Sequence, residues 1–111
     1  MTNNDSIIAL ATPSGVGAIA VIRVSGNGSI GLVSQFFRSK SGKKLLDQKS
    51  HTFHLGYIMD GNTILDEVLV SVFKNPHSFT GENTVEINCH GSTFIQQKII
   101  ELLINNGARL A

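Results

Sequence analysis

The chain contains no tryptophan, a single cysteine and only two prolines among its 111 residues. One cysteine cannot form an internal disulfide, which excludes the small disulfide-stabilised secreted scaffolds. Charged residues make up only 15% of the sequence, and nine Lys and Arg against eight Asp and Glu leave a net charge of +1. This balance gives no protein-wide field that would attract nucleic acid, so a basic binding surface would have to be local.

Long hydrophobic runs are also missing. No apolar stretch approaches the roughly 18 residues that a membrane-spanning helix needs, and the N-terminus lacks the positive segment and the cleavage-like end of a signal peptide. We therefore expect a cytoplasmic protein without a membrane partner. Hydrophobic residues still make up 41% of the chain, which is enough for the core of one domain over residues 1–111.

The hydrophobic pattern predicts an α+β fold, with a mixed β-sheet and two to three helices packed on it. Strands are expected at 6–11, 18–24, 52–59, 63–73 and 84–90, with a further strand beginning near residue 109. Helices are expected at 28–38 and after Gly91, the second ending at the stop signal Asn106-Gly107. The run at 18–24 is nearly all apolar, which is typical of a strand covered on both faces. Residues 38–50 read as a basic connection.

Three local signals support these elements. Asp60-Gly61-Asn62 is a strong hairpin signal between two predicted strands. Thr93 followed by Gln96 fits a capping box at the start of the last helix. The strand at 84–90 alternates apolar and polar residues, and Cys89 on its apolar side is most simply a small buried hydrophobe.

The sequence contains neither of two common nucleotide-binding motifs in a form that could function. Residues 15–20 match G-x-G-x-x-A, but a strand follows where the dinucleotide fingerprint needs a helix to hold the pyrophosphate. No G-x-x-x-x-G-K-[S/T] phosphate-binding loop occurs, so we do not expect this chain to hydrolyse a nucleoside triphosphate by that route. The histidines and the cysteine lack the spacing of a metal centre, and no metal ligand or catalytic residue is predicted.

Arg23 and Glu86 are the most informative charged residues. Arg23 is the one charge in the run 18–24, and Glu86 interrupts Val85-Glu86-Ile87. A guanidinium on a mostly covered strand needs an anionic partner. Either the two side chains pair with each other, or both line a pocket in which Glu86 accepts two parallel donors of a planar heterocycle and Arg23 meets its anionic or carbonyl end.

Two further segments are candidates for binding. The turn-rich loop at 75–82 leads directly toward Glu86 and would form the rim of such a pocket. The basic stretch at 38–49, with Lys40, Lys43 and Lys44, would contact RNA phosphates, or it is simply a solvated loop, because no aromatic residues interleave to stack bases.

Several motifs in succession resemble the N-terminal domain of the MnmE (TrmE) family of tRNA-modifying GTPases. They are IIALATP at 7–13, GVGAIAVIRVSG at 15–26, SFTGE at 78–82, VEI at 85–87 and CHG at 89–91. Each motif is weak alone, but their order is specific, and the resemblance covers essentially the whole chain. Asn83 and Ser92 stand where the family usually has Asp and Gly.

The resemblance implies a domain similar to the folate-binding domain of the glycine-cleavage T protein. It implies homodimerisation and binding of 5-formyltetrahydrofolate as a one-carbon donor, with the folate contacts falling on Arg23 and Glu86 and a third, a lysine, beyond Ala111. The whole protein is expected to modify the wobble uridine (U34) of tRNA together with MnmG (GidA). GTP, Mg²⁺ and K⁺ would be bound by a GTPase domain downstream of this chain.

Two alternatives stay open beside this expectation. In the first, the chain is a dimerisation scaffold without a ligand of its own, with Arg23 and Glu86 paired internally. Alternatively, it is a weak tRNA-contacting module that uses the lysines at 38–49.

Overall fold

A computed structural model describes residues 5–12, 18–76 and 81–111. In these ranges the structure has a mixed sheet with helices packed on it, which confirms the predicted α+β class. The strands are β1 (Ser6–Leu10), β2 (Ile19–Ser25), β3 (Phe37–Ser39), β4 (Thr52–Asp60), β5 (Thr63–Phe73), β6 (Thr84–His90) and β7 (Ala108–Leu110). The helices are α1 (Ser29–Ser34), the 3₁₀ turn η1 (Leu45–Asp47) and α2 (Thr93–Asn105). The expected similarity to the T protein stays a prediction.

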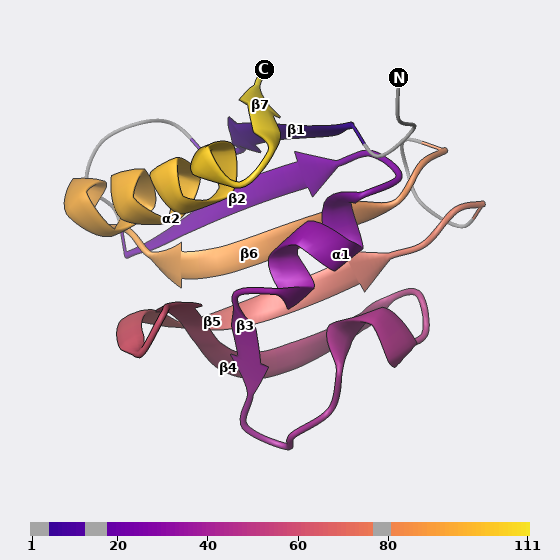
Figure 1. The fold of residues 1–111 in the computed structure, drawn as a ribbon, viewed down its shortest axis with the longest axis horizontal. Helices are drawn as coiled ribbons and strands as arrows, with labels where there is room; N and C mark the ends of the chain where they lie inside the picture. The colour runs from indigo at the N-terminus through magenta and orange to yellow at the C-terminus, as the bar shows by residue number, and fades with distance from the viewer. Residues whose placement is uncertain (1–4, 13–17, 77–80) are drawn as a thin grey trace.

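The seven strands of the described residues form one sheet in the order β3-β4-β5-β6-β2-β1-β7. Every neighbouring pair is antiparallel except β1 and β7, which are parallel. Both α-helices lie on the same side of this sheet, α1 over its middle and α2 toward the β1 and β7 edge (Figure 1). The sheet therefore has a helix-covered face and, opposite to it, a face that we call the open face.

Strand alternation separates the two faces along β2. Ala20, Ile22 and Val24 are buried under the helices, whereas Ile19 on the open face is 64% exposed. The expectation of a strand covered on both faces is therefore wrong. Apolar residues on an uncovered face give the same sequence pattern as buried ones, so composition alone could not separate the two cases.

The predicted helix at 28–38 is much shorter than its periodicity suggested. α1 ends at Ser34, and Phe37 instead pairs with Ile58 as β3 adds to the edge of the sheet beside β4. The predicted basic connection at 38–50 thus begins as a strand and also contains η1. Tertiary pairing outweighs helical spacing here because Gly31 weakens the helix and the phenylalanine spacing is compatible with either structure.

The last helix begins one residue earlier than the predicted capping box. Ser92 is its N-cap, and the Ser92 hydroxyl accepts a hydrogen bond from the Ile95 amide at 3.3 Å. Gln96 is buried and donates from Nε2 to the carbonyl of Gly91 at 3.1 Å. The Ser92 cap satisfies one of the amides that the start of the helix leaves without a partner, and the Gln96 contact ties the first turns of α2 to the residue that follows β6.

Cys89 lies in the core on the helix-covered side of β6, as predicted. Burial raises the pKa of its thiol to about 11, and the nearby Asp66 carboxylate adds to this effect. A thiol with this pKa is almost entirely protonated at neutral pH. Cys89 therefore acts as a packing residue and not as a nucleophile.

Glycine is required at position 56 by packing. A Cβ added to Gly56 would lie 2.7 Å from the Phe37 ring and would overlap the Arg38 carbonyl oxygen. We expect Gly56→Ala to lower the free energy of unfolding by about 1–3 kcal/mol. A Cβ at Gly31 meets no atom within 4 Å, so Gly31→Ala should raise it by about 0.5–1 kcal/mol. Urea denaturation measures both, and equal effects would contradict the assigned β3–β4 packing.

The Cys89 thiol should be almost unreactive in the folded protein. A rise in pKa from 9.0 to about 11 leaves about 100-fold fewer thiolates at neutral pH, in addition to steric exclusion. Ellman's reagent should therefore modify the native chain far more slowly than the chain in guanidinium chloride. A cysteine placed at the exposed Ser41 provides the matched control. Rapid labelling of the native wild-type chain would contradict this burial.

Candidate functional site

The structure places Arg23 and Glu86 directly opposite each other in the antiparallel pairing of β2 with β6. Arg23 donates to Glu86 Oε2 from Nε at 2.9 Å and from Nη2 at 2.7 Å. Of the two arrangements left open by the sequence, the internal ion pair is the one observed. Because both strands alternate in step, both side chains lie on the open face.

The pair is not buried. The Arg23 side chain is 47% exposed and that of Glu86 is 26% exposed, so the expected cost of an unpaired guanidinium on a covered strand does not apply. An exposed ion pair of this kind is worth about 0–1 kcal/mol. Among the described residues, Glu86 Oε1 and Arg23 Nη1 have no hydrogen-bond partner. The pair therefore keeps an acceptor and a donor available, and a ligand could rearrange it at small energetic cost.

Exposed apolar side chains surround the pair on the open face. Phe53 is 70% exposed, and Leu55, Ile7 and Ile19 are exposed as well. The row of residues that crosses the strands at the pair is Ala9, Arg23, Glu86, Ser71 and Phe53. An exposed apolar surface centred on a charge pair is typical of an interaction site.

Two hollows lined by described residues lie away from the pair, and neither is lined by Arg23 or Glu86. One, of about 550 Å³, lies on the helix-covered side between α1, η1 and the end of α2. The other, of about 200 Å³, lies at the end of β6 and is lined by Ile19, Glu67, Leu69, Asn88, Cys89 and His90. Among the described residues, the Arg23–Glu86 pair lies on the partly exposed surface of the sheet.

A second polar pair was not anticipated from the sequence. Asp66, buried on β5, accepts from the His90 backbone amide at 2.8 Å and contacts His90 Nδ1 at 2.7 Å. An aspartate within an apolar strand next to a second acid, Leu65-Asp66-Glu67, was the available signal. It could not be interpreted, because its partner lies 24 residues away along the chain.

Two candidate segments lie partly outside the described residues. These are residues 13–17 of the glycine-rich motif and residues 77–80 of the predicted rim loop. The two departures from the family pattern have structural roles. Asn83 Oδ1 accepts from the Asn75 amide at 2.8 Å, and Ser92 caps α2.

The lysines at 38–49 do not form a single free basic surface. Lys40 forms an ion pair with Glu67, and its ammonium lies 5.5 Å from the centre of the Tyr57 ring. Lys43 and Lys44 are exposed. The predicted RNA contact through this stretch stays a prediction.

Within residues 5–12, 18–76 and 81–111, no three His, Cys, Asp or Glu side chains gather closely enough to hold a metal ion. The helices there are too short to cross a membrane.

Comparison with known proteins adds a consistent set of relatives, each described as a tRNA modification GTPase MnmE. The chain is 61% identical over 111 residues to the protein of Flavobacterium psychrophilum and 51% identical over 110 residues to that of Bacteroides thetaiotaomicron. It is 47% identical over 113 residues to the protein of Geobacillus kaustophilus. The matches cover 98–100% of this chain but only 23–24% of each relative, so the chain spans about a quarter of their length.

A family model described as the GTP-binding protein TrmE N-terminus matches residues 6–111, which is nearly the whole chain. The resemblance inferred from the sequence motifs is thereby confirmed. The chain belongs to the TrmE N-terminal domain family.

Proposed function

We propose that this chain is the folate-binding and dimerisation domain of a tRNA modification GTPase, with Arg23 and Glu86 as ligand contacts. The observation that supports the proposal is the exposed cross-strand pair, in which one carboxylate oxygen and one guanidinium nitrogen have no partner among the described residues. Family membership supports the proposal that the chain is part of a tRNA modification GTPase. The exposed ion pair supports the proposal that Arg23 and Glu86 contact a ligand.

The chemistry of the pair suits a reduced pterin. A pterin ring offers an N–H and an amino group as parallel donors, which one carboxylate accepts together, and its neighbouring carbonyl accepts from a guanidinium. Glu86 would accept hydrogen bonds from the two donors, and Arg23 would donate to the carbonyl. The bound folate, 5-formyltetrahydrofolate, would supply a one-carbon unit, and the residues of this chain would bind and orient it.

A second copy of the chain would complete the site. Small-molecule sites usually enclose most of the ligand surface, whereas Arg23 and Glu86 line neither of the hollows described above. The exposed apolar residues around them would be covered if two open faces met. Homodimerisation would thus bury the apolar surface and enclose the folate in one step.

The longer protein implied by the relatives would carry the remaining activities. We propose that it hydrolyses GTP in a downstream domain that binds GTP, Mg²⁺ and K⁺. It would act in the cytoplasm with MnmG (GidA) on the wobble uridine (U34) of tRNA. This chain would contribute the folate and the dimer interface, and it contains no phosphate-binding loop of its own.

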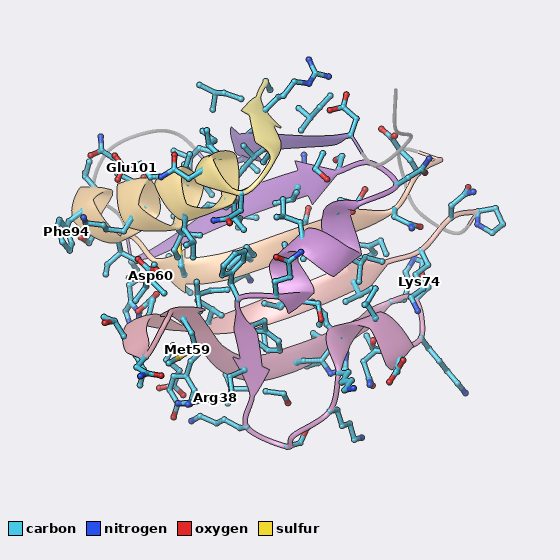
Figure 2. The ribbon with its side chains drawn as sticks, viewed as in Figure 1. Arg38, Met59, Asp60, Lys74, Phe94 and Glu101 are labelled. Carbon is cyan, nitrogen blue, oxygen red and sulfur yellow. The ribbon has the colours of Figure 1, made fainter. Side chains whose placement is uncertain are left out.

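Replacing Glu86 should remove most of the folate affinity. We expect Glu86→Ala to weaken binding of 5-formyltetrahydrofolate by tenfold or more in calorimetry, because a paired carboxylate contact is worth about 1.5–3 kcal/mol. Glu101→Ala is the matched control, since Glu101 is exposed on α2, on the other side of the sheet (Figure 2). Absence of binding to the wild-type chain would support the scaffold alternative, and equal binding by Glu86→Ala would remove Glu86 from the site.

Charging the open face should prevent dimerisation. Leu55→Asp places a carboxylate in the exposed apolar surface and should shift the chain from dimer to monomer in sedimentation equilibrium, with no loss of secondary structure. Phe94→Asp is the control, because Phe94 is similarly exposed but lies at the start of α2 (Figure 2). A wild-type chain that stays monomeric at every concentration, or a dimer that is lost only with Phe94→Asp, would contradict the proposed interface.

A further inference from the structure

Positive charge is concentrated in one part of the molecule. Residues 38–50 together with Lys74 contain six of the nine Lys and Arg and only one of the eight Asp and Glu, which gives a net charge of +5 there. The other three cations and seven anions leave the rest of the chain at −4. We call residues 38–50 with Lys74 the basic end. It borders β4, at the edge of the sheet away from α2 and β7 (Figure 1).

Contacts within the fold hold the backbone of the basic end in place. The Leu45 side chain of η1 is buried in the core. The Lys74 backbone amide donates to the Ser50 hydroxyl at 2.8 Å, and the Thr52 hydroxyl donates to the Lys49 carbonyl at 2.6 Å. The stretch is therefore not the loose solvated loop that its sequence allowed, and its lysines extend from a defined backbone.

Lys74 belongs to this surface although it lies outside the basic stretch of the sequence. Its ammonium donates to the Leu46 carbonyl at 3.0 Å, which brings a cation from the residue after β5 against η1 (Figure 2). An ammonium group has three donors, so two remain for another acceptor. The sequence could not reveal this neighbour, because Lys74 and Leu46 are 28 residues apart along the chain.

The protein itself already engages two other cations of the basic end. The Lys40 ammonium forms an ion pair with Glu67. The Arg38 guanidinium and the Lys40 ammonium lie 5.6 and 5.5 Å from the centre of the Tyr57 ring, within reach of a cation–π interaction. Their charges are therefore less available to an outside partner than the charge of a solvated lysine.

Four lysines of the basic end keep their charge uncompensated. Lys43, Lys44 and Lys49 are exposed. Among the described residues, neither these three nor Lys74 form an ion pair. The charge of the basic end is thus presented by ammonium groups that an anionic partner can approach directly, while the acidic remainder of the chain favours an approach from this side.

We propose that Lys43, Lys44, Lys49 and Lys74 form a docking surface for the phosphate backbone of duplex RNA. Lysine ammonium groups are compact charges that bind phosphates without distinguishing bases. Residues 38–50 contain no aromatic side chain on which an unpaired base could stack, which favours a duplex over a single strand. The choice of RNA among anionic partners rests on the proposed function, in which the longer protein acts on tRNA.

The test is the salt dependence of RNA binding by the whole chain. Fluorescence anisotropy with a fluorescein-labelled RNA hairpin should give a slope of about −3 to −4 in a plot of log K against log salt, as expected for four phosphate contacts. Lys43→Gln and Lys74→Gln should each weaken binding several-fold at low salt and reduce the magnitude of the slope by about one. Absence of binding, or a slope near zero, would overturn the proposal.

Matched variants separate a local contact from an effect of total charge. Lys98→Gln removes the same charge from an exposed position on α2, and it should bind RNA nearly as wild type does. Lys40→Gln should also have little effect, because Glu67 already pairs with this lysine. If either control lost as much affinity as Lys43→Gln, the proposed surface would be overturned.

A charge-conserving variant tests whether Lys74 acts through its charge. Lys74→Arg should retain RNA binding that Lys74→Gln loses, with circular dichroism showing that both variants are folded. Equal losses in the two variants would remove Lys74 from the surface, because the effect would then come from the contact with the Leu46 carbonyl.

Two parallel titrations identify the partner and separate this inference from the proposed function. Binding to vesicles of phosphatidylglycerol and phosphatidylcholine, without binding to the RNA hairpin, would overturn RNA as the partner. Calorimetry with 5-formyltetrahydrofolate should give the same affinity for Lys43→Gln as for wild type. Folate binding without RNA binding would overturn only this inference, whereas RNA binding without folate binding would overturn only the folate site.

Discussion

The pairing register of β2 with β6 is the constraint on which the rest of the structure depends. Side chains alternate with a period of two, so a slip by one residue would move every buried side chain of one strand to the other face. In the observed register Ile22 faces Ile87 in the core while Arg23 faces Glu86 outside it. The same register brings Ile19 beside His90, so it creates the charge pair and the hollow together.

The difference between the two faces of the sheet explains where chemistry is available. Helices cover one face, and the side chains beneath them form a dry aliphatic core in which even the one cysteine is held as a protonated thiol. The opposite face carries the ion pair, exposed aromatic and aliphatic residues and the oriented histidine. A single chain leaves that surface open to solvent, which is unfavourable for large apolar groups and favours a partner of matching shape.

The two polar pairs at β6 are physically different. Arg23 and Glu86 form an exposed pair that contributes little stability and can rearrange around a ligand. Asp66 and His90 join a buried carboxylate to an exposed ring, and the contacts to the His90 backbone amide and to Nδ1 fix the position of the histidine. The exposed pair can therefore rearrange more easily than the half-buried one.

The sequence by itself determined the elements whose signals are local and the family to which the chain belongs. The hairpin at Gly61, the alternation of 84–90 and the burial of Cys89 all follow from adjacent residues, and the order of the motifs identified the family. The sequence also singled out Arg23 and Glu86 as unusual charges. It left open whether they pair with each other, because their distance depends on which strands become neighbours.

Only the tertiary structure decided the features that join distant segments. The extent of α1 depended on whether Phe37 continued a helix or paired with β4, and local spacing allowed both. The exposure of one side of β2 depended on where the helices pack, which apolar composition does not encode. The Asp66–His90 contact arises because β5 and β6 lie side by side, and a pattern read along one strand carries no information about the residue opposite it.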